Sequence, residues 1–355
     1  MNAPAVNQSA LESFVMHAVN DLASAYTGAM VSLGSKLGLY KAMAGAGPLS
    51  SREVAASAGC AERYVREWLN AQAASGYIDY HAESETYELS PEHAVVLADD
   101  TSPAYIPPAW NVPASMFIDE PKSLEAFRTG AGVAWGEHDG RLHCGVAAFY
   151  RNGYSASLVP QWLPALDGVT AQLEAGISVA DVGCGFGYST VLMAQAFPQS
   201  RFYGFDGHPG SIEEARRHAA AADVGARASF ATARAVDYPD KQYGLICFFD
   251  CLHDLGDPVA ALRHAAATLA PGGTVMLVEP FANDKVEDNF SLAGQLYYAG
   301  STTICTAHAI SEGGHYVLGA QAGEARLTEV ARAAGFTHIR RAAETPFNLI
   351  FELRR

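Results

Sequence analysis

The segment that most constrains the fold is SVADVGCGFGYSTVLMAQAF, residues 178–197. An apolar run ends in Asp181, glycines follow at positions 183, 185 and 187, and a helical pattern then begins. Glycine adopts left-handed backbone conformations at little cost, and the first turn of a helix leaves backbone N–H groups unpaired. The segment therefore predicts a strand, a tight turn and a helix, with bare backbone available to a ligand.

The glycine spacing is G-x-G-x-G, whereas dinucleotide-binding turns usually read G-x-G-x-x-G beside a pyrophosphate. The tighter turn, preceded by an acid, favours a nucleoside-type ligand without a phosphate, and S-adenosylmethionine (SAM) is the leading candidate. Asp181 can orient the turn or face an ammonium group, and it can also be a simple strand-end cap. The predicted cofactor contacts in this segment are Asp181, Gly183, Cys184, Gly185 and Gly187.

Later strand ends extend this predicted cofactor site. Asp206 ends a second strand, where an acid can accept hydrogen bonds from ribose hydroxyls. Arg234 stands at the end of the third strand and cannot accept from an adenine amino group, so we expect backbone of Arg234 or Ala235 to do so. The predicted contacts here are Asp206, Gly207, Arg234, Ala235 and Phe249.

From Gly176 onward, strand and helix patterns alternate. The predicted strands are 178–183, 201–206, 228–233, 243–249, 274–280, 338–345 and 348–354. This alternation predicts an α/β fold with a Rossmann-like, mainly parallel sheet covered by helices on both faces. The last connection, around ETPFN, is too short for a crossover helix, so we expect a carboxyl-terminal antiparallel hairpin.

Residues 30–90 predict a small winged-helix domain. Two short helices are expected over 50–59 and 61–78, followed by a two-stranded wing in IDYHAESETYELS. Such a domain can bind DNA, but residues 50–95 carry three arginines against eight acids, a balance of −5, and phosphate binding requires the opposite sign. We expect a structural or dimerising role and no nucleic-acid partner.

An amphipathic helix precedes the winged helix. Ser9 and Glu12 have the spacing of a capping box, and apolar residues then recur with a helical period up to Tyr26. The helix either packs on its own domain or joins two copies of the chain. The expected organisation is a helix and winged-helix domain at 1–95, a helical linker at 96–170 that contributes to a substrate pocket, and a cofactor domain at 171–355.

His253 is the principal catalytic candidate. It follows the fourth strand in CFFDCLHDLGDP, and open α/β sheets bind ligands beyond the carboxyl ends of their strands. A neutral histidine there can take a proton from a hydroxyl that attacks a methyl group, while Asp254 or Asp257 orients its ring. The predicted catalytic residues are His253 and Asp254.

A lid over the acceptor pocket is expected in the segment after the fifth strand, EDNFSLAGQLYYAGSTTICTAHA. Its predicted pocket residues are Tyr297, Tyr298 and His308. A looser set of His308, His315 and Glu279 can join His253 in a metal site, but the spacing is no metal-ligand motif, and we expect no metal.

These motifs carry a resemblance to a known family. DVGCGFG, FDGH, FFDCLHDLGDP, LAPGGTVMLVEP and ARAAGF resemble, in that order, the class I SAM-dependent methyltransferases, whose sheet also ends in an antiparallel hairpin. LHDLGDP followed by APGGTVMLVEP is similar to small-molecule O-methyltransferases with an N-terminal winged-helix dimerisation domain. The stretches GVAWGEHDG and YRNGYSASLVPQWLPALDG resemble a bacterial subgroup of mostly unassigned substrates. The resemblance implies that His253 is the general base.

Two departures from that family concern the substrate more than the cofactor. Leu255 stands where plant-type members have tryptophan after the His-Asp pair, and the acidic adenine contact is missing. The expected function is SAM-dependent methyl transfer to a small, aromatic or apolar molecule that bears a hydroxyl. The alternatives are a metal-assisted C-methyltransferase of α-keto acids and a SAM-sensing transcription regulator.

Composition sets the remaining expectations. The net charge of −15 opposes nonspecific binding to nucleic acid or anionic lipid. The six cysteines form no CxxC pair, and no long apolar run or secretory signal is evident. We therefore expect a cytoplasmic homodimer with a small-molecule acceptor and no membrane partner.

Overall fold

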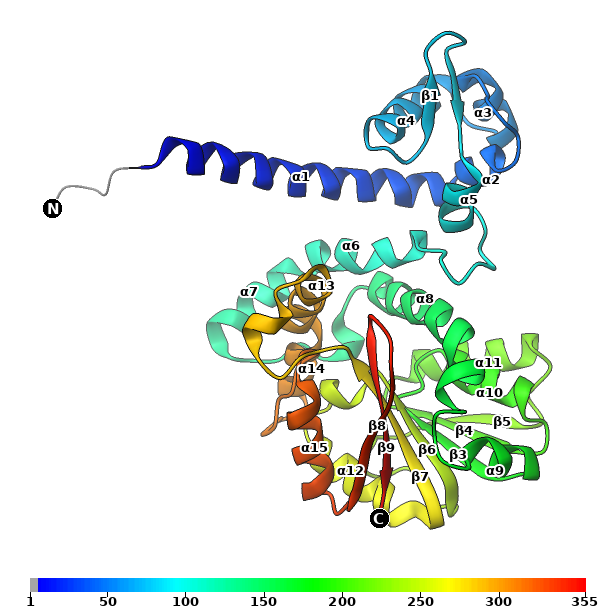
Figure 1. Ribbon diagram of the computed structural model, residues 1–355, viewed down its shortest axis with the longest axis vertical. Coiled ribbons are helices and arrows are strands. Elements are labelled where there is room, and N and C mark those ends of the chain that lie inside the picture. The colour runs from blue at the N-terminus through cyan, green and yellow to red at the C-terminus, as the bar shows by residue number, and fades with distance from the viewer. Residues whose placement is uncertain (1–5) are drawn as a thin grey trace, which may run out of the picture. The chain divides into compact units, whose positions relative to one another are not determined.

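The structure is a computed structural model that describes residues 6–355. The chain forms two compact units (Figure 1). One unit holds the chain up to Pro113 together with Cys144–Asn152, and the other holds Ala114–His143 and Gly153–Arg355. The expected linker at 96–170 is therefore divided between the two units. No helix in residues 6–355 is both long enough and apolar enough to cross a membrane.

The first unit is a long helix followed by a winged helix. Its elements are α1 (Gln8–Lys36), α2 (Leu39–Met43), α3 (Ser51–Ala58), α4 (Glu62–Ala74), β1 (Asp79–His81), β2 (Thr86–Glu88), α5 (Pro91–Leu97) and η1 (Pro107–Trp110). A capping box of Ser50 and Glu53 starts α3, and left-handed Gly59 ends it. Tyr40, Trp68 and Leu69 lie in the apolar core beneath the antiparallel β1–β2 wing.

The long helix α1 differs from its expectation at its start. Asn7, not Ser9, is the N-cap, and its side chain accepts a hydrogen bond from the Ala10 amide. Only Gly28, Val31 and Gly34 of α1 are buried. Most of the predicted apolar face is therefore exposed within this chain.

The second unit adds helices before its sheet and along it. Those before the sheet are α6 (Asn111–Ile118), α7 (Glu120–Thr129), η2 (Trp135–Glu137), α8 (Gly140–Ser157), η3 (Leu158–Trp162) and α9 (Val169–Ala175). The bounds of α6 and α8 run across the division between the units. Those within and after the sheet are α10 (Tyr188–Ala196), α11 (Pro209–Ala221), η4 (Leu252–Asp254), α12 (Pro258–Thr268), η5 (Val286–Asn289), α13 (Leu292–Gly300), η6 (Ser301–Cys305), α14 (Thr306–Ser311) and α15 (Gly323–Ala333).

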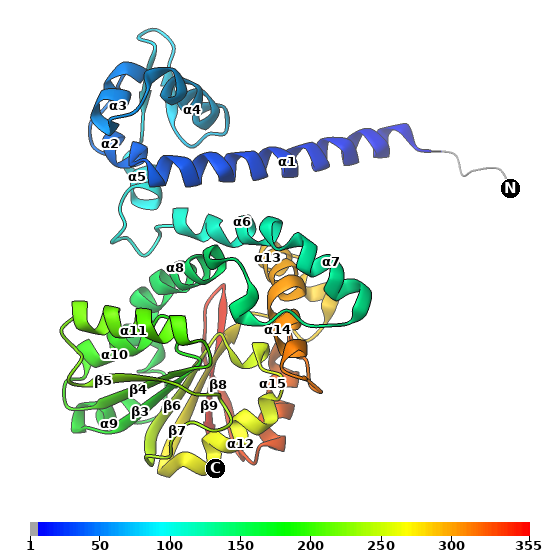
Figure 2. The same cartoon turned by 180° about the vertical axis from the view of Figure 1, so that it is seen from behind.

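The sheet has seven strands in the order β5-β4-β3-β6-β7-β9-β8 (Figure 2). They are β3 (Ser178–Val182), β4 (Arg201–Asp206), β5 (Ala228–Thr232), β6 (Tyr243–Phe249), β7 (Leu269–Pro280), β8 (His338–Glu344) and β9 (Asn348–Arg354). The first five are parallel, and β9 pairs antiparallel with both β7 and β8. The predicted α/β class and the antiparallel hairpin are confirmed. Strand β7 starts five residues earlier than expected, because Leu269 pairs with Tyr243 before a register shift.

The order of the strands identifies the edge of the sheet at which a ligand is expected to bind. The crossovers through α10 and α11 run outward from β3, whereas the crossover through α12 runs the other way from β6. Since parallel crossovers are right-handed, the two groups of helices cover opposite faces. The direction of winding therefore reverses between β3 and β6. Ligands of such sheets bind beyond the carboxyl ends of the strands beside this switch point.

Candidate active site

The glycine turn follows β3 directly at this edge. Gly183, Gly185 and Gly187 have φ angles of 73°, 51° and 75°. A Cβ atom on Gly183 would lie 2.6 Å from the Cys251 sulfur, and one on Gly187 would lie 2.8 Å from the Phe230 ring. A Cβ atom on Gly185 would meet no atom within 4 Å. The outer glycines are thus required by packing, while Gly185 faces open space.

Asp181 lies at the end of β3 and is buried. Its Oδ2 accepts hydrogen bonds from the hydroxyls of Ser189 and Thr190, both at 2.6 Å, which ties the strand to the first turn of α10. Its Oδ1 is buried and has no hydrogen-bond partner. Burial raises the pKa of Asp181 to about 6. Most buried polar atoms in proteins have a hydrogen-bond partner, so this oxygen is open to a donor group.

Asp206 holds the other side of the turn. Its Oδ2 accepts from the Gly185 amide at 2.9 Å, and its Oδ1 accepts from the His208 amide at 2.8 Å. Burial raises the pKa of Asp206, and the two backbone donors oppose that shift. Each carboxylate oxygen has a second lone pair for further donors. The structure thus brings Asp181 and Asp206 to the same turn.

The remaining predicted cofactor residues lie at neighbouring strand ends. The Arg234 guanidinium forms an ion pair with Asp237 at 2.6 Å on the surface, so this side chain is engaged outside the site. Ala235 packs against the apolar core. Phe249 is buried beside the Tyr154 ring, with 5.4 Å between centroids.

His253 sits in η4, just after β6, and is buried. Its Nδ1 donates to Oε2 of Glu279 at 2.6 Å, and Oε1 of Glu279 accepts from the Leu252 amide at 3.0 Å. Its Nε2 lies 3.1 Å from Oδ1 of Asp254. Glu279, rather than Asp254 or Asp257, therefore orients the ring through Nδ1, and Asp257 instead caps α12 through the Ala260 amide.

The charges around His253 are unusual for a buried side chain. Burial alone disfavours its protonated form, but the carboxylates of Asp254 and Glu279 raise its pKa well above the usual range. These carboxylates therefore stabilise the protonated form of the ring against the effect of burial. Glu279 holds Nδ1, and Nε2 is the ring nitrogen on the side of Asp254.

His308 is connected to a segment that lies far earlier in the chain. The Trp135 amide donates to Nδ1 of His308 at 3.2 Å, and the Trp135 carbonyl accepts from Nε2 of His143 at 3.0 Å. The centroid of the His143 ring lies 4.8 Å from that of the His208 ring, and the His208 amide donates to Asp206. Trp135 was not among the predicted site residues. Its signal was the AWGEH stretch, which carries no spacing that identifies a contact.

The other predicted pocket residues are placed less closely together. The Tyr297 hydroxyl donates to the Phe347 carbonyl at 2.8 Å, which fastens α13 to the turn before β9. Tyr298 is half-buried, and its carbonyl accepts from Thr302. His315 is exposed.

Asp250 is a buried acid that sequence reasoning passed over. It has a left-handed backbone, with φ of 50°. Its two oxygens accept from the Tyr154 hydroxyl at 2.8 Å and the Asn348 side chain at 2.7 Å. Burial raises its pKa well above the usual range. The acid links α8, β6 and β9, and its signal was its place in FFDCLHD.

Two segments of the chain match known families. Residues 25–99 match the Rv2258c-like winged HTH domain, and residues 179–273 match a methyltransferase domain. The 27-O-demethylrifamycin SV methyltransferase of Amycolatopsis mediterranei (strain S699) is 31% identical over 160 residues, 44% of this chain and 56% of that protein. The trans-aconitate 2-methyltransferase of Streptomyces coelicolor is 35% identical over 103 residues, 29% of this chain and 34% of that protein. The chain thus spans about half, or less, of the length of these curated relatives.

Solved structures match over nearly the whole chain at low identity. Mitomycin 7-O-methyltransferase MmcR has a TM-score of 0.68 at 17% identity and covers 98% of this chain and 100% of its own. Human N-acetylserotonin methyltransferase in complex with SAM has a TM-score of 0.69 at 16% identity and covers 99% of both chains. The chain therefore carries a segment that matches an Rv2258c-like winged HTH domain and a segment that matches a methyltransferase domain, and it shares the fold of these two solved methyltransferases.

Proposed function

We propose that the protein is a SAM-dependent methyltransferase that methylates a hydroxyl of a small, aromatic or apolar molecule. The observation that carries this proposal is His253, held by Glu279 at the carboxyl edge of a methyltransferase-type sheet. Two of the similar proteins are named for methyl transfer to a numbered oxygen of a small molecule, 27-O-demethylrifamycin SV methyltransferase and mitomycin 7-O-methyltransferase. These names support the acceptor class without identifying the acceptor.

The residues present fit SAM. The unpartnered Oδ1 of Asp181 can accept from the ammonium of the methionine part, and Gly185 leaves open space at the turn. Asp206 can accept from ribose hydroxyls while it keeps its two backbone donors. The backbone at Arg234 and Ala235 is assigned to the adenine. When bound, SAM supplies an electrophilic methyl group on a sulfonium.

His253 acts on the acceptor. In the proposed reaction, the neutral ring takes the hydroxyl proton at Nε2, and the acceptor oxygen would then receive the methyl group that bound SAM supplies. Glu279 holds Nδ1, and Asp254, 3.1 Å from Nε2, stabilises the protonated ring. Positioning contributes roughly 7–11 kcal/mol in such reactions, and base catalysis on the order of 10²–10⁴-fold.

We also propose that α1 joins two copies of the chain. Phe14 and Tyr26 are each 68% exposed, and further exposed apolar residues of the helix lie between and beside them. These are Leu11, Val15, Met16, Val19 and Leu22. A helix of this length presents a surface about 40 Å long, and such apolar patches mark interaction sites. A second copy fits the patch because the acidic chain discourages nucleic acid or anionic lipid as the occupant.

Light scattering after size-exclusion chromatography tests the dimer. The natural chain should elute as a dimer, and Leu22→Glu should shift it toward a monomer. Asn20→Glu, an equal charge change on the same helix, should leave the dimer intact. A monomeric natural chain would contradict this part of the proposal.

The enzymatic proposal is tested by two measurements on one pair of variants. Calorimetry with S-adenosylhomocysteine (SAH), the demethylated product, measures cofactor binding. Methyl transfer from labelled SAM to a panel of phenols and hydroxylated polyketides measures turnover. His253→Ala should bind SAH as the natural chain does and lose turnover, whereas His338→Ala, an exposed histidine on β8, should change neither. Absence of SAH binding would overturn the methyltransferase proposal, and normal turnover in His253→Ala would overturn the base assignment.

A further inference from the structure

We propose that His253, Asp254 and Cys305 form a binding site for Zn²⁺, and that the metal and methyl transfer exclude one another at Nε2 of His253. The metal site is argued from the positions of these three side chains and does not depend on the proposed function. The exclusion rests on the proposed function of His253.

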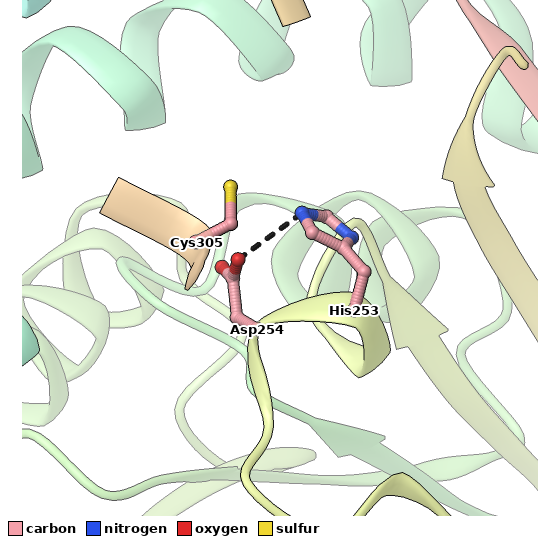
Figure 3. Close-up of side chains that lie close together, drawn as sticks. All are labelled: His253, Asp254 and Cys305. Carbon is pink, nitrogen blue, oxygen red and sulfur yellow. Dashed lines mark ion pairs between the residues drawn. The ribbon is translucent and has the colours of Figure 1, made fainter. Parts of the chain in front are cut away.

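Three donors of different chemistry meet at this point (Figure 3). One ligand atom of each residue, the imidazole nitrogen, a carboxylate oxygen and the thiol sulfur, lies within 4.8 Å of the others. Zinc bonds of about 2.0–2.3 Å place tetrahedral ligands roughly 3.5 Å apart. Small side-chain rotations therefore suffice to bring the three atoms onto one ion.

Two local features of the backbone bring these three side chains together. Asp254 directly follows His253 in η4, and Cys305 ends η6, a π-helical turn between α13 and α14. Such single π turns inside α-helices are often found at functional sites. Elements η4 and η6 are in contact, so a residue about 50 positions downstream reaches the histidine.

Glu279 supplies the outer shell that a metal-bound histidine requires. Histidines that ligate metals nearly always donate their other ring N–H to a carboxylate or carbonyl. Here Nδ1 donates to Glu279 at 2.6 Å, and Glu279 is itself held by the Leu252 amide. This bond directs the lone pair of the neutral ring, at Nε2, toward Asp254 and Cys305.

The local charge favours a divalent cation. Asp254 and Glu279 are the acids that act most strongly on His253. Oδ1 of Asp254 is buried and lies 3.1 Å from Nε2 of His253, where the two groups form an ion pair. A metal ion at this point would replace the ion pair and bind that oxygen. A divalent cation would neutralise both carboxylates.

The donor set selects the metal. Mg²⁺ and Ca²⁺ prefer oxygen ligands only, whereas sulfur and imidazole together favour zinc and similar transition metals. Burial and the neighbouring Asp254 raise the pKa of the Cys305 thiol to about 12, so the unloaded site holds a thiol that the metal must deprotonate. Three protein ligands leave the fourth zinc position open.

Zinc at this site would use the lone pair that methyl transfer requires. Nε2 cannot both ligate the ion and receive the acceptor proton. We therefore expect Zn²⁺ to inhibit turnover reversibly. Cys305 has no part in the proposed reaction, so its loss should remove the metal and leave the chemistry.

Cobalt substitution tests the binding without turnover. Metal-free full-length protein is titrated with Co²⁺ in the absence of SAM, and the thiolate-to-cobalt charge-transfer band is followed. The natural chain and Cys144→Ser, a matched exposed cysteine, should show the band at one ion per chain. Cys305→Ser should lose it, and Asp254→Asn should keep it with affinity reduced at least about tenfold. Circular dichroism confirms that each variant is folded.

Absence of stoichiometric binding, or a full band in folded Cys305→Ser, would overturn the metal site. Inhibition is measured separately, with Zn²⁺ added to turnover assays and then removed by a chelator. Zn²⁺ should inhibit the natural chain, and Cys305→Ser should require at least about tenfold more Zn²⁺ for the same inhibition. Zn²⁺ that binds without lowering turnover would overturn the exclusion, while a chain that binds Co²⁺ but methylates nothing would overturn the proposed function alone.

Discussion

The cofactor turn and the His253 corner lie at the same edge of one sheet but are built in different ways. The turn is made from residues that are close in sequence, since Asp181, the three glycines and Ser189 fall within one strand–turn–helix segment. The His253 corner is assembled from η4, the end of β7 and the π turn η6. Local chemistry specifies the first region, and long-range packing specifies the second.

The comparison predicts that changes in the His253 corner damage turnover and spare cofactor binding. Glu279→Gln should lower kcat about 10²-fold, because a neutral amide stabilises the protonated His253 ring less than a carboxylate does. The affinity for SAH should stay within about twofold of the natural chain. Calorimetry and single-turnover assays separate the two quantities, and an equal loss of both would remove the distinction between the regions.

Substitutions in the turn should instead lower stability or cofactor binding. Gly183→Ala places a Cβ atom 2.6 Å from the Cys251 sulfur at a φ of 73°, so we expect a stability loss of ~1–3 kcal/mol. Gly185→Ala meets no atom within 4 Å and should lose less stability, but it should weaken SAH binding because the methyl group enters the open space. Thermal unfolding with and without SAH measures both. Equal destabilisation by the two variants would contradict the separate roles of these glycines.

The pH dependence of cofactor binding should identify Asp181. Its pKa of about 6 means that the carboxylate is ionised above that pH and neutral below it. Attraction for an ammonium group is therefore lost as the pH falls, and SAH should bind roughly tenfold more weakly at about pH 5 than at about pH 7. Asp181→Asn should bind weakly at both values. A natural chain with flat affinity across this range would show that Asp181 does not meet the ammonium.

Arg234 should give the smallest effect. Its guanidinium pairs with Asp237 on the surface, and such exposed ion pairs contribute about 0–1 kcal/mol. Because only the backbone is assigned to adenine, Arg234→Ala should change the SAH dissociation constant less than about twofold. A large loss in calorimetry would place the side chain in the cofactor site.

The sheet illustrates how far sequence patterns reach. Apolar runs bounded by turn residues predicted every strand of the second unit, and most ends differ by at most one residue. The early start of β7 was missed, because APGG has the composition of a turn and its pairing beside Tyr243 depends on the neighbouring strand. The N-cap of α1 was misplaced for a similar reason, since both Asn7 and Ser9 are good caps and local sequence does not choose between them.

The His253 corner shows where such reasoning ends. The sequence offered Asp254 and Asp257 as partners of the ring because they are its neighbours in the chain, yet Glu279 occupies Nδ1 and Asp257 caps a helix. Cys305 and Trp135 gave no signal that joined them to the site, and Asp250 gave only its place in FFDCLHD. Their contacts depend on a π turn, on a segment more than 170 residues from His308 and on a left-handed backbone.

The sequence by itself determined the α/β class, the hairpin, the glycine turn and the acids at its strand ends. Periodicity, turn chemistry and residue spacing act over a few residues, and each of these features is that short. Only the tertiary structure decided which oxygen of Asp181 is free, which acid holds His253 and that a thiol lies beside its Nε2. Those facts depend on how strands and helices distant in sequence come together, because side-chain contacts across a sheet edge leave no periodic trace in the chain.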